Sequence, residues 1–255
     1  MKPARLHPLA RALPLLALLG LAACASAPRS DSGPVRVPQN VRGPETWPAG
    51  LVRVALLPAH DASGRLPAEF VAGYDASWSR ALASAQRAEL VGVSRATLAS
   101  WTGRETLDST AALPPGLLRR VAAETGAQAV MFLDLVEISP YPPLSLAFRA
   151  RLVTAADGDT VWMVDEIFDH RDAASARASR KDARAQASGA GDPAAAVQQS
   201  PARLADHAFR AVAALLPPRQ AAPSADAPAA AATSEKSENT LRAKNFPVRA
   251  DNPAQ

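Results

Sequence analysis

Residues 129–168 read AVMFLDLVEISPYPPLSLAFRARLVTAADGDTVWMVDEIF, and this stretch decides the expected fold. Its segments 129–138, 144–154 and 160–168 are rich in the β-branched, aliphatic and aromatic residues that favour strands. In the middle segment mostly polar residues alternate with apolar ones, at Leu144, Leu146, Phe148 and Leu152. Such alternation is typical of a strand with one buried and one solvated face. The stretch therefore predicts an antiparallel meander.

Two turn signals separate these three strands. Residues 139–143 contain prolines at 140, 142 and 143, and proline cannot continue a hydrogen-bonded ladder. Asp157-Gly158 favours a tight two-residue hairpin. A tight turn at that point pairs positions whose numbers sum to about 315, so we expect Arg149 to oppose Glu166 on the solvated face.

The sequence ahead of the meander alternates strands and helices. Residues 51–57 predict a buried strand, and residues 88–93 predict a second, short strand. Between them, Pro67 is typical of the first turn of a helix. Aromatic and aliphatic residues recur in that helix at every fourth position, at Phe70, Tyr74, Trp78 and Leu82. This spacing places them on one face, and we interpret them as core residues that cover the sheet.

Four further helices complete the expected domain. Ser94 caps a short helix to about residue 101, and residues 116–125 form another. Residues 172–190 predict a helical insertion, and a helix from Ser200 or Pro201 closes the domain. The sequence thus predicts an α+β fold. It has a mixed sheet of about five strands, a C-terminal antiparallel meander, and helices packed mainly on one face.

The amino terminus has the features of an export signal. Residues 1–11 are basic, and residues 12–23 form an apolar run that would reach only about 18 Å as a helix. A bilayer core of about 30 Å needs a longer run, so this segment is a signal peptide and not a membrane span. The run ends in residues that resemble the bacterial lipobox, Leu21, Ala22, Ala23 and Cys24.

The lipobox resemblance implies a lipid-anchored protein. Signal peptidase II would cut before Cys24, whose thiol would carry the lipid, and acyl chains such as palmitate would hold the protein in a membrane. Ala25 after the cysteine favours the outer membrane by the sorting rule that the resemblance implies, with the protein facing the periplasm. The alternative is an ordinary secretory signal followed by a stray thiol.

Composition divides the chain into four parts. We expect a lipoprotein signal peptide at 1–23, a lipidated, proline-rich flexible tether at 24–50, and an αβ domain at 51–217. The domain includes an Arg- and Ala-rich insertion at about 172–199. Residues 218–255 form an Ala- and Pro-rich tail that we expect to be disordered.

Charge and cysteine content exclude several functions. The chain has 28 basic and 24 acidic residues, and removal of residues 1–23 leaves 25 basic residues and a net charge of +1. A nucleic-acid-binding protein shows a clustered basic face, so we expect no nucleic-acid partner. The single cysteine, Cys24, rules out an internal disulfide or a cysteine-based zinc site within one chain.

The insertion carries a stripe of cations at helical spacing, at Arg177, Arg180, Lys181 and Arg184. One interpretation is contact with an anionic surface such as lipid A or a glycan strand. The other is a solvated helix face.

Few residues suggest chemistry. The sequence has no Gly-rich phosphate loop, no Gly-x-Ser-x-Gly elbow and no His-Glu-x-x-His motif, so we expect neither an enzyme nor a bound cofactor. Two loops could bring together candidates for a metal or acid–base site, His60, Asp61, Asp169 and His170. Asp134 lies on an otherwise apolar strand face, with Asp165 as a second carboxylate for an acid–base pair.

The order of elements resembles a known class of envelope proteins. The lipobox is followed by VALLP at 54–58, ETGAQAVMFLD at 124–134 and DGDTVW at 157–162. This order resembles the αβ domain of the TolB amino-terminal region, of LpoB-like activators of penicillin-binding proteins, and of curli-secretion lipoproteins of the CsgG type. The resemblance covers about residues 51–216. The 102–115 stretch and the Arg-rich insertion do not match it.

The resemblance implies a non-enzymatic binding or adaptor module for an envelope assembly, with regulation of peptidoglycan synthesis as one candidate role. Its partners would be the membrane, through the Cys24 lipid, and an envelope protein, and a homo-oligomer remains open. The alternative is a subunit of a curli-type secretion channel. A third interpretation is a metal-dependent envelope hydrolase that uses the loops of His60 and Asp169.

Overall fold

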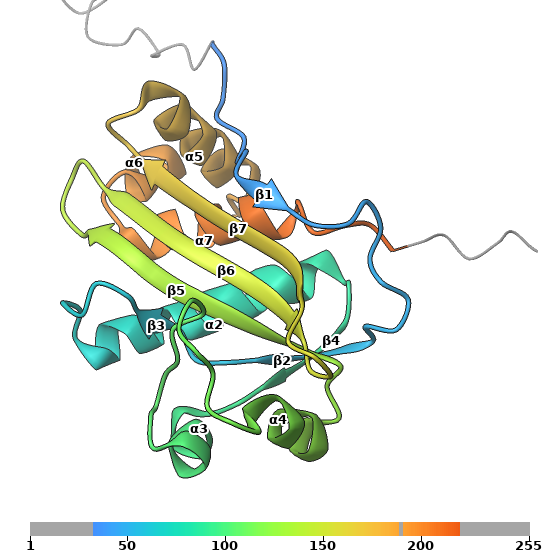
Figure 1. Cartoon of the computed structure of the whole chain (residues 1–255). Helices are drawn as coiled ribbons and strands as arrows, with labels where there is room; N and C mark the ends of the chain where they lie inside the picture. Colours follow the sequence, from blue (N-terminus) through green and yellow to red (C-terminus); the bar gives the residue numbers. More distant parts are fainter. Residues whose placement is uncertain (1–32, 189–190, 220–255) are drawn as a thin grey trace, which may run out of the picture. The chain divides into compact units, whose positions relative to one another are not determined.

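A mixed sheet of seven strands organises the described residues, 33–188 and 191–219, of this computed structural model (Figure 1). The strand order is β1-β7-β6-β5-β2-β4, and β3 also pairs with β5. Strands β2, β3, β4 and β5 pair in parallel, and the other pairs are antiparallel. The strands are β1 Val41–Arg42, β2 Arg53–Leu56, β3 His60–Asp61, β4 Glu89–Gly92, β5 Ala129–Ser139, β6 Ser145–Thr154 and β7 Thr160–Asp169.

The α+β class and the C-terminal meander are confirmed, and the sheet has two more strands than expected. Both additions, β1 and β3, are two residues long. Such short strands leave no hydrophobic period in the sequence, so the pattern of apolar residues could not reveal them.

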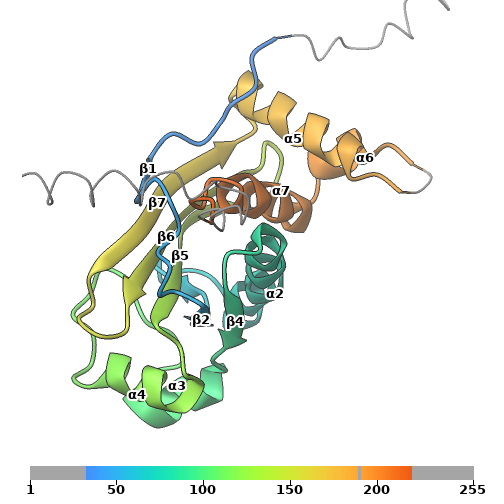
Figure 2. The ribbon, with the colours of Figure 1, turned by 90° about the vertical axis from the view of Figure 1, so that its right-hand side faces the viewer.

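Six helices are present in the described part of the chain. Helices α2 and α7 cover one face of the sheet, and α3 and α4 cover the other face at the end near β2 and β4 (Figure 2). The helices are α2 Ala68–Ala85, α3 Arg95–Thr102, α4 Leu117–Thr125, α5 Ala173–Ala185, α6 Pro193–Val197 and α7 Pro201–Ala213. Helix α6 was not expected. No helix in the described residues is both long and apolar enough to cross a membrane.

The main core lies between the sheet and helices α2 and α7. Trp78 of α2 makes edge contacts with Phe148 of β6 and Phe209 of α7, with ring centroids 6.3 and 5.2 Å apart. Tyr74 and Leu82 are also buried. The stripe at every fourth residue of α2 is therefore core, as predicted.

A second core lies under α3 and α4. Ala55 of β2 and Phe132 of β5 pack there against Leu98 of α3 and Val121 of α4. Strands β2 and β5 are thus buried on both faces along part of their length, which explains their nearly continuous apolar sequences.

The β6–β7 register differs by one position from the expected one. Arg149 pairs with Asp165, and Glu166 pairs with Phe148. The turn is longer than two residues, because the amide of Thr154 donates to the carbonyl of Asp159, and the register shifts again after Leu152. A shift of one residue moves a side chain to the opposite face of a sheet. The predicted Arg149–Glu166 pair is therefore wrong, and Glu166 lies on the face that carries the main core.

Residues 33–50, which we call the strap, were expected to be part of a flexible tether, but they pack on the domain. They lie along the domain (the blue segment in Figure 1), and their β1 pairs with the free edge of β7. Trp47 is buried, and its Nε1 donates to the carbonyl of Leu51 at 2.7 Å. Burying an indole removes a large apolar area from water, which outweighs the proline-rich character of the segment. The expected signal peptide, residues 24–32 and the tail from residue 220 lie outside the described residues.

Candidate functional site

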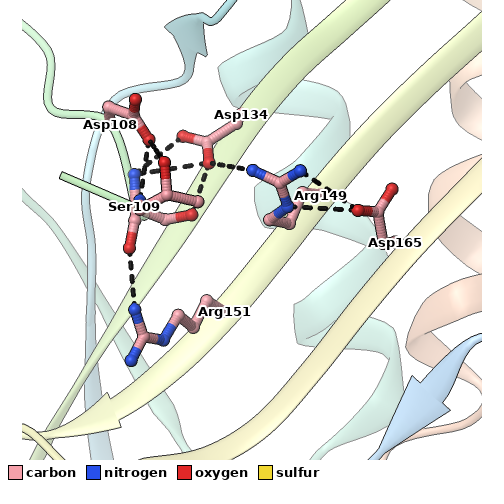
Figure 3. Close-up of polar contacts among 7 residues, drawn as sticks. Asp108, Ser109, Asp134, Arg149, Arg151 and Asp165 are labelled. Carbon is pink, nitrogen blue, oxygen red and sulfur yellow. Dashed lines mark hydrogen bonds and ion pairs between the residues drawn. The ribbon is translucent and has the colours of Figure 1, made fainter.

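Three charged side chains form a row across β5, β6 and β7. Asp134 is paired in register with Arg149, and Arg149 with Asp165, so all three lie on the same face of the sheet (Figure 3). Arg149 donates to Oδ2 of Asp165 from Nε at 3.2 Å and from Nη2 at 3.1 Å. Its Nη1 lies 4.0 Å from Oδ2 of Asp134. The two carboxylates singled out in the sequence are therefore on one face, with a guanidinium between them.

Asp134 is completely buried and holds a loop against the sheet. The amide of Ser109 donates to its Oδ1 at 3.1 Å, and the Ser109 hydroxyl donates to Oδ2. Arg151 of β6 donates to the carbonyl of Ser109 at 2.8 Å. Burial raises the pKa of the Asp134 carboxyl above its ordinary value, although the hydrogen bonds from Ser109 act in the opposite direction. This carboxylate fixes the loop between α3 and α4 on the sheet face and is shielded from solvent.

Glu166 makes the corresponding anchor on the other face. It accepts hydrogen bonds from the amides of Gln39 and Asn40, at 2.5 and 2.6 Å, and from Arg36 Nη2 at 2.8 Å. Burial raises the pKa of Glu166, but the hydrogen bonds from Asn40, Arg36 and Gln39 outweigh it and hold the pKa below its ordinary value. Glu166 thus holds the strap on the domain as a charged group.

The first loop with candidate site residues, which contains His60 and Asp61, makes structural contacts. Nδ1 of His60 lies 3.0 Å from the Thr106 hydroxyl. Asp61 accepts hydrogen bonds from the amide and hydroxyl of Ser63 and from the amide of Leu66. These contacts close the turn that leads into α2.

The second loop with candidate site residues, which contains Asp169 and His170, lies at the end of β7. Asp169 pairs with Arg171 at 2.9 Å, and Nε2 of His170 lies 2.9 Å from the Ser179 hydroxyl in α5. Burial lowers the pKa of His170 to about 4, so its imidazole is neutral at pH 7. The structure does not bring this loop together with His60. No group of three or more His, Cys, Asp or Glu side chains in the described ranges is placed to hold a metal ion.

A third carboxylate, which is half-buried, joins the insertion to the closing helix. Asp182 of α5 accepts a hydrogen bond from Arg210 Nη2 at 2.6 Å and lies 3.1 Å from Nδ1 of His207, both on α7. Burial raises the pKa of Asp182, and the hydrogen bonds from His207 and Arg210 lower it further than burial raises it. Neither contact of Asp182 was expected from the sequence pattern. His207 is buried, and a buried polar side chain needs a hydrogen-bond partner, which Asp182 supplies.

The expected lipobox, Leu21, Ala22, Ala23 and Cys24, lies outside the described residues. Among described side chains, sequence reasoning missed Ser109 and the hydrogen bonds that Glu166 accepts from the strap. Ser109 lies in an irregular stretch with no pattern, and the Glu166 contacts depend on register.

No known protein family matches the sequence, and no curated protein sequence matches it. Solved structures do match. The PelC dodecamer from Paraburkholderia phytofirmans is 13% identical over 71% of this chain and 98% of that chain, with a TM-score of 0.38. Lipoprotein GNA1162 from Neisseria meningitidis is 15% identical over 46% and 80%, with a TM-score of 0.35. The LpoB C-terminal domain from Salmonella enterica is 18% identical over 47% and 85%, with a TM-score of 0.30.

The structural neighbours thus include one lipoprotein, GNA1162, and an LpoB domain. The sequence resemblance also named LpoB-like proteins. At these identities and TM-scores the likeness assigns neither a family nor a function to the chain.

Proposed function

We propose that this chain is an outer-membrane lipoprotein, facing the periplasm, whose domain binds another envelope protein and has no enzymatic activity of its own. The observation that carries the proposal is the lipobox-like run from Leu21 to Cys24 ahead of a folded αβ domain. Lipid chains on Cys24 would anchor the domain stably, because multiple acyl chains suffice for membrane anchoring.

The roles of three carboxylates, two buried and one half-buried, support binding rather than catalysis. Asp134 holds a loop, Glu166 holds the strap, and Asp182 joins two helices. Each of these carboxylates accepts hydrogen bonds from the protein itself. Their role is to fix the shape of the domain, which suits a module that presents a rigid surface to a partner.

The surface we assign to the partner is the part of the β6–β7 face that α3 and α4 leave uncovered (Figure 1). We call it the open sheet face, and it comprises Ala147, Arg149, Met163, Asp165 and Ile167. Ile167 is 37% exposed, and the Arg149–Asp165 pair lies beside it. Methionine and arginine are among the residues enriched at protein interfaces, and Met163 and Arg149 both lie on this face.

A role in peptidoglycan synthesis is one form of this proposal. A long tether would support this role, because it would let the domain reach across the periplasm. The strap lies on the domain, so fewer residues than expected are left to act as a tether. A peptidoglycan synthase that binds this domain would have to reach toward the outer membrane itself.

The second candidate is a subunit of a secretion channel. Strands β6 and β7 each have 10 residues, which is the length of a membrane-spanning strand. However, Phe148 and Trp162 of these strands are buried in the main core. The hairpin would have to leave that core, which makes this candidate the weaker one.

The test is in-cell photocrosslinking of the full-length protein, with the crosslinking residue at Ile167 and, as the control, at Glu69 on the exposed side of α2. We expect one envelope protein to be captured from position 167 and not from 69, in a complex of defined size. Capture of only further copies of this chain, in a ring, would favour the channel.

Anchoring is tested separately with Cys24→Ser. We expect the variant to move from the membrane to the soluble periplasmic fraction and to lose the mass of the lipid. A variant that stays in the membrane fraction would contradict lipidation at Cys24.

A further inference from the structure

A cavity of about 710 Å³ lies between the loop that joins β5 to β6 and the segment that follows α6 (Figure 1). Three separate segments of the chain line it. Two prolines come from the β5–β6 loop, a histidine follows β7, and two glutamines follow α6, and these residues are Pro142, Pro143, His170, Gln198 and Gln199. Both prolines and Gln199 are exposed, so the cavity opens to solvent.

A buried hydroxyl, that of Ser179 in α5, holds two of the lining side chains in place. Ser179 is completely buried, and its hydroxyl donates its one proton to the carbonyl of Ala176 at 3.0 Å. Toward Nε2 of His170, at 2.9 Å, and Nε2 of Gln198, at 3.2 Å, the hydroxyl is therefore the acceptor. Both of these nitrogens donate to Ser179, which fixes the orientation of the Gln198 amide group.

The two glutamines offer hydrogen bonds to a ligand. One N–H of Gln198 is bonded to Ser179, whereas its carbonyl oxygen Oε1 accepts no hydrogen bond within the described residues. Gln198 thus presents an acceptor to the cavity, and the exposed amide of Gln199 adds both a donor and an acceptor. Because Ser179 orients Gln198 before a ligand arrives, binding loses less side-chain entropy.

Apart from these amides the lining is apolar or uncharged. The two prolines present the C–H groups of their rings, and Tyr141, which precedes them in the chain, is 78% exposed. Burial lowers the pKa of His170 to about 4, so its ring is neutral at pH 7. The neighbouring carboxylate, Asp169, is paired with Arg171. Among the described residues, no charged side chain lines this cavity at pH 7.

This combination fits an uncharged sugar. The faces of a sugar ring carry C–H groups that can pack on proline and tyrosine rings, and its edge carries polar groups that can pair with amides. A charged ligand would lose hydration without gaining a partner of opposite charge. A purely apolar ligand would cover the glutamine amides and leave them without hydrogen bonds. The lining therefore disfavours both of these alternatives.

We propose that this cavity, together with the adjacent Tyr141, binds an uncharged glycan of N-acetylated sugars. The acetamido N–H of such a sugar would donate to Oε1 of Gln198, and its carbonyl would accept from the amide of Gln199. Its methyl group would contact the prolines. The inference requires neither the lipid on Cys24 nor the proposed protein partner, and it gives the domain a second kind of ligand.

The test is calorimetric titration of the chain from residue 24, with Cys24→Ser, by a tetramer of N-acetylglucosamine. We expect saturable binding that is equal at about 0.1 M and about 1 M salt, because salt screens only interactions between charges. A tetramer of glucose, which lacks the acetamido group, should bind about five-fold more weakly, the effect of one lost hydrogen bond.

Substitutions locate the site. Tyr141→Ala and Gln198→Ala should each weaken binding about five-fold, whereas Tyr141→Phe keeps the ring and should bind as the wild type does. The matched control is Gln39→Ala, which removes an exposed glutamine side chain of the strap that does not line the cavity. Thermal unfolding midpoints verify folding. Because Tyr141 is exposed, its variants test the site even if Gln198→Ala is less stable.

Several outcomes would overturn the proposal. They are no binding of the N-acetylglucosamine tetramer at about 10 mM, loss of binding at high salt, and equal binding of the glucose tetramer. Binding that both Tyr141→Ala and Gln198→Ala leave unchanged, or an equal loss in Gln39→Ala, would also overturn it.

Once binding is established, sedimentation with purified peptidoglycan distinguishes two sources of the glycan. Sedimentation that the tetramer competes away identifies the cell wall, and its absence identifies another glycan with the same sugars. These assays use unlipidated protein and no partner. A failure of the proposed function appears instead in the mass of Cys24 and in the capture from position 167.

Discussion

Two buried carboxylates in the described residues, Asp134 and Glu166, have opposite pKa shifts because their partners differ. Asp134 receives its hydrogen bonds from one residue, Ser109, and burial keeps its pKa above the ordinary value. Glu166 receives hydrogen bonds from two backbone amides and a guanidinium, and its pKa lies below the ordinary value. Burial therefore favours protonation of the first, and hydrogen bonding keeps the second ionised.

At Asp134 we predict that Asp134→Ala lowers the free energy of unfolding by about 2 kcal/mol, because the buried amide and hydroxyl of Ser109 lose their acceptor. Asp134→Asn should change it by less than about 1 kcal/mol, since its amide can still bond Ser109 without a buried charge. Urea unfolding at pH 7 measures both. An equal loss in the two variants would show that the charge itself is required.

At Glu166 we predict a pH-dependent loss. A carboxyl whose pKa is lower in the folded state stabilises the fold above its unfolded pKa, and this contribution disappears as the pH falls through the folded pKa. Glu166→Gln should therefore cost about 2 kcal/mol at pH 7 and progressively less below about pH 4. The measurement is urea unfolding across this pH range, with Glu137→Gln on the exposed side of β5 as the control. A constant difference between wild type and Glu166→Gln would contradict the assigned charge.

At the scale of elements, short segments with little secondary structure of their own complete the sheet. The strap contributes only two residues to β1, yet it covers the edge of β7 and buries Trp47. An uncovered edge strand offers unpaired backbone groups to other chains. The strap therefore protects part of the outer edge of β7.

We predict that Trp47→Ala lowers the free energy of unfolding by about 3 kcal/mol, the usual cost of truncating a buried aromatic side chain. The strap should also open locally, so that trypsin cuts after Arg42 much faster than in the wild type. Trp101→Ala, at a half-buried position on α3, is the control. A strap that resists trypsin in Trp47→Ala would show that Glu166 and β1 hold it without the tryptophan.

At the scale of the whole molecule, the folded domain begins earlier than the hydrophobic pattern suggests. The pattern starts at Leu51, but the structure places β1, Trp47 and the Glu166 contacts ahead of that residue. These contacts join the start of the chain to β7, and the amide of Trp47 also donates to the carbonyl of Pro218 at 2.8 Å. Both ends of the domain are thus tied together.

We predict that a chain beginning at residue 51 is less stable than one beginning at residue 33, and that it self-associates through the β7 edge. Both chains would end at residue 219. Urea unfolding and sedimentation velocity test this. Equal unfolding midpoints and a monomer in both cases would mean that the strap adds nothing to the domain.

Local sequence patterns determined much of this protein. The aromatic stripe of α2, the cap at Ser94 and the three long strands all follow from residues close together in the chain. Ser94, for example, accepts the amide of Thr97 at 3.0 Å, as its position predicted. Such features depend on the period of apolar residues and on side chains that bond to the nearby backbone, so the sequence contains the information directly.

Only the tertiary structure revealed that the strap packs on the domain, on which side of the sheet Glu166 lies, and which residues are the partners of Asp134 and Asp182. Each depends on contacts between residues far apart in sequence, such as Glu166 with Arg36 or Asp182 with Arg210. A one-residue change of register reverses the face of every side chain in a strand. Turn chemistry does not specify register to that precision when the loop is longer than two residues. The physical reason is that long-range pairing follows the free energy of the whole core, whereas the local sequence shows only the preference of each segment.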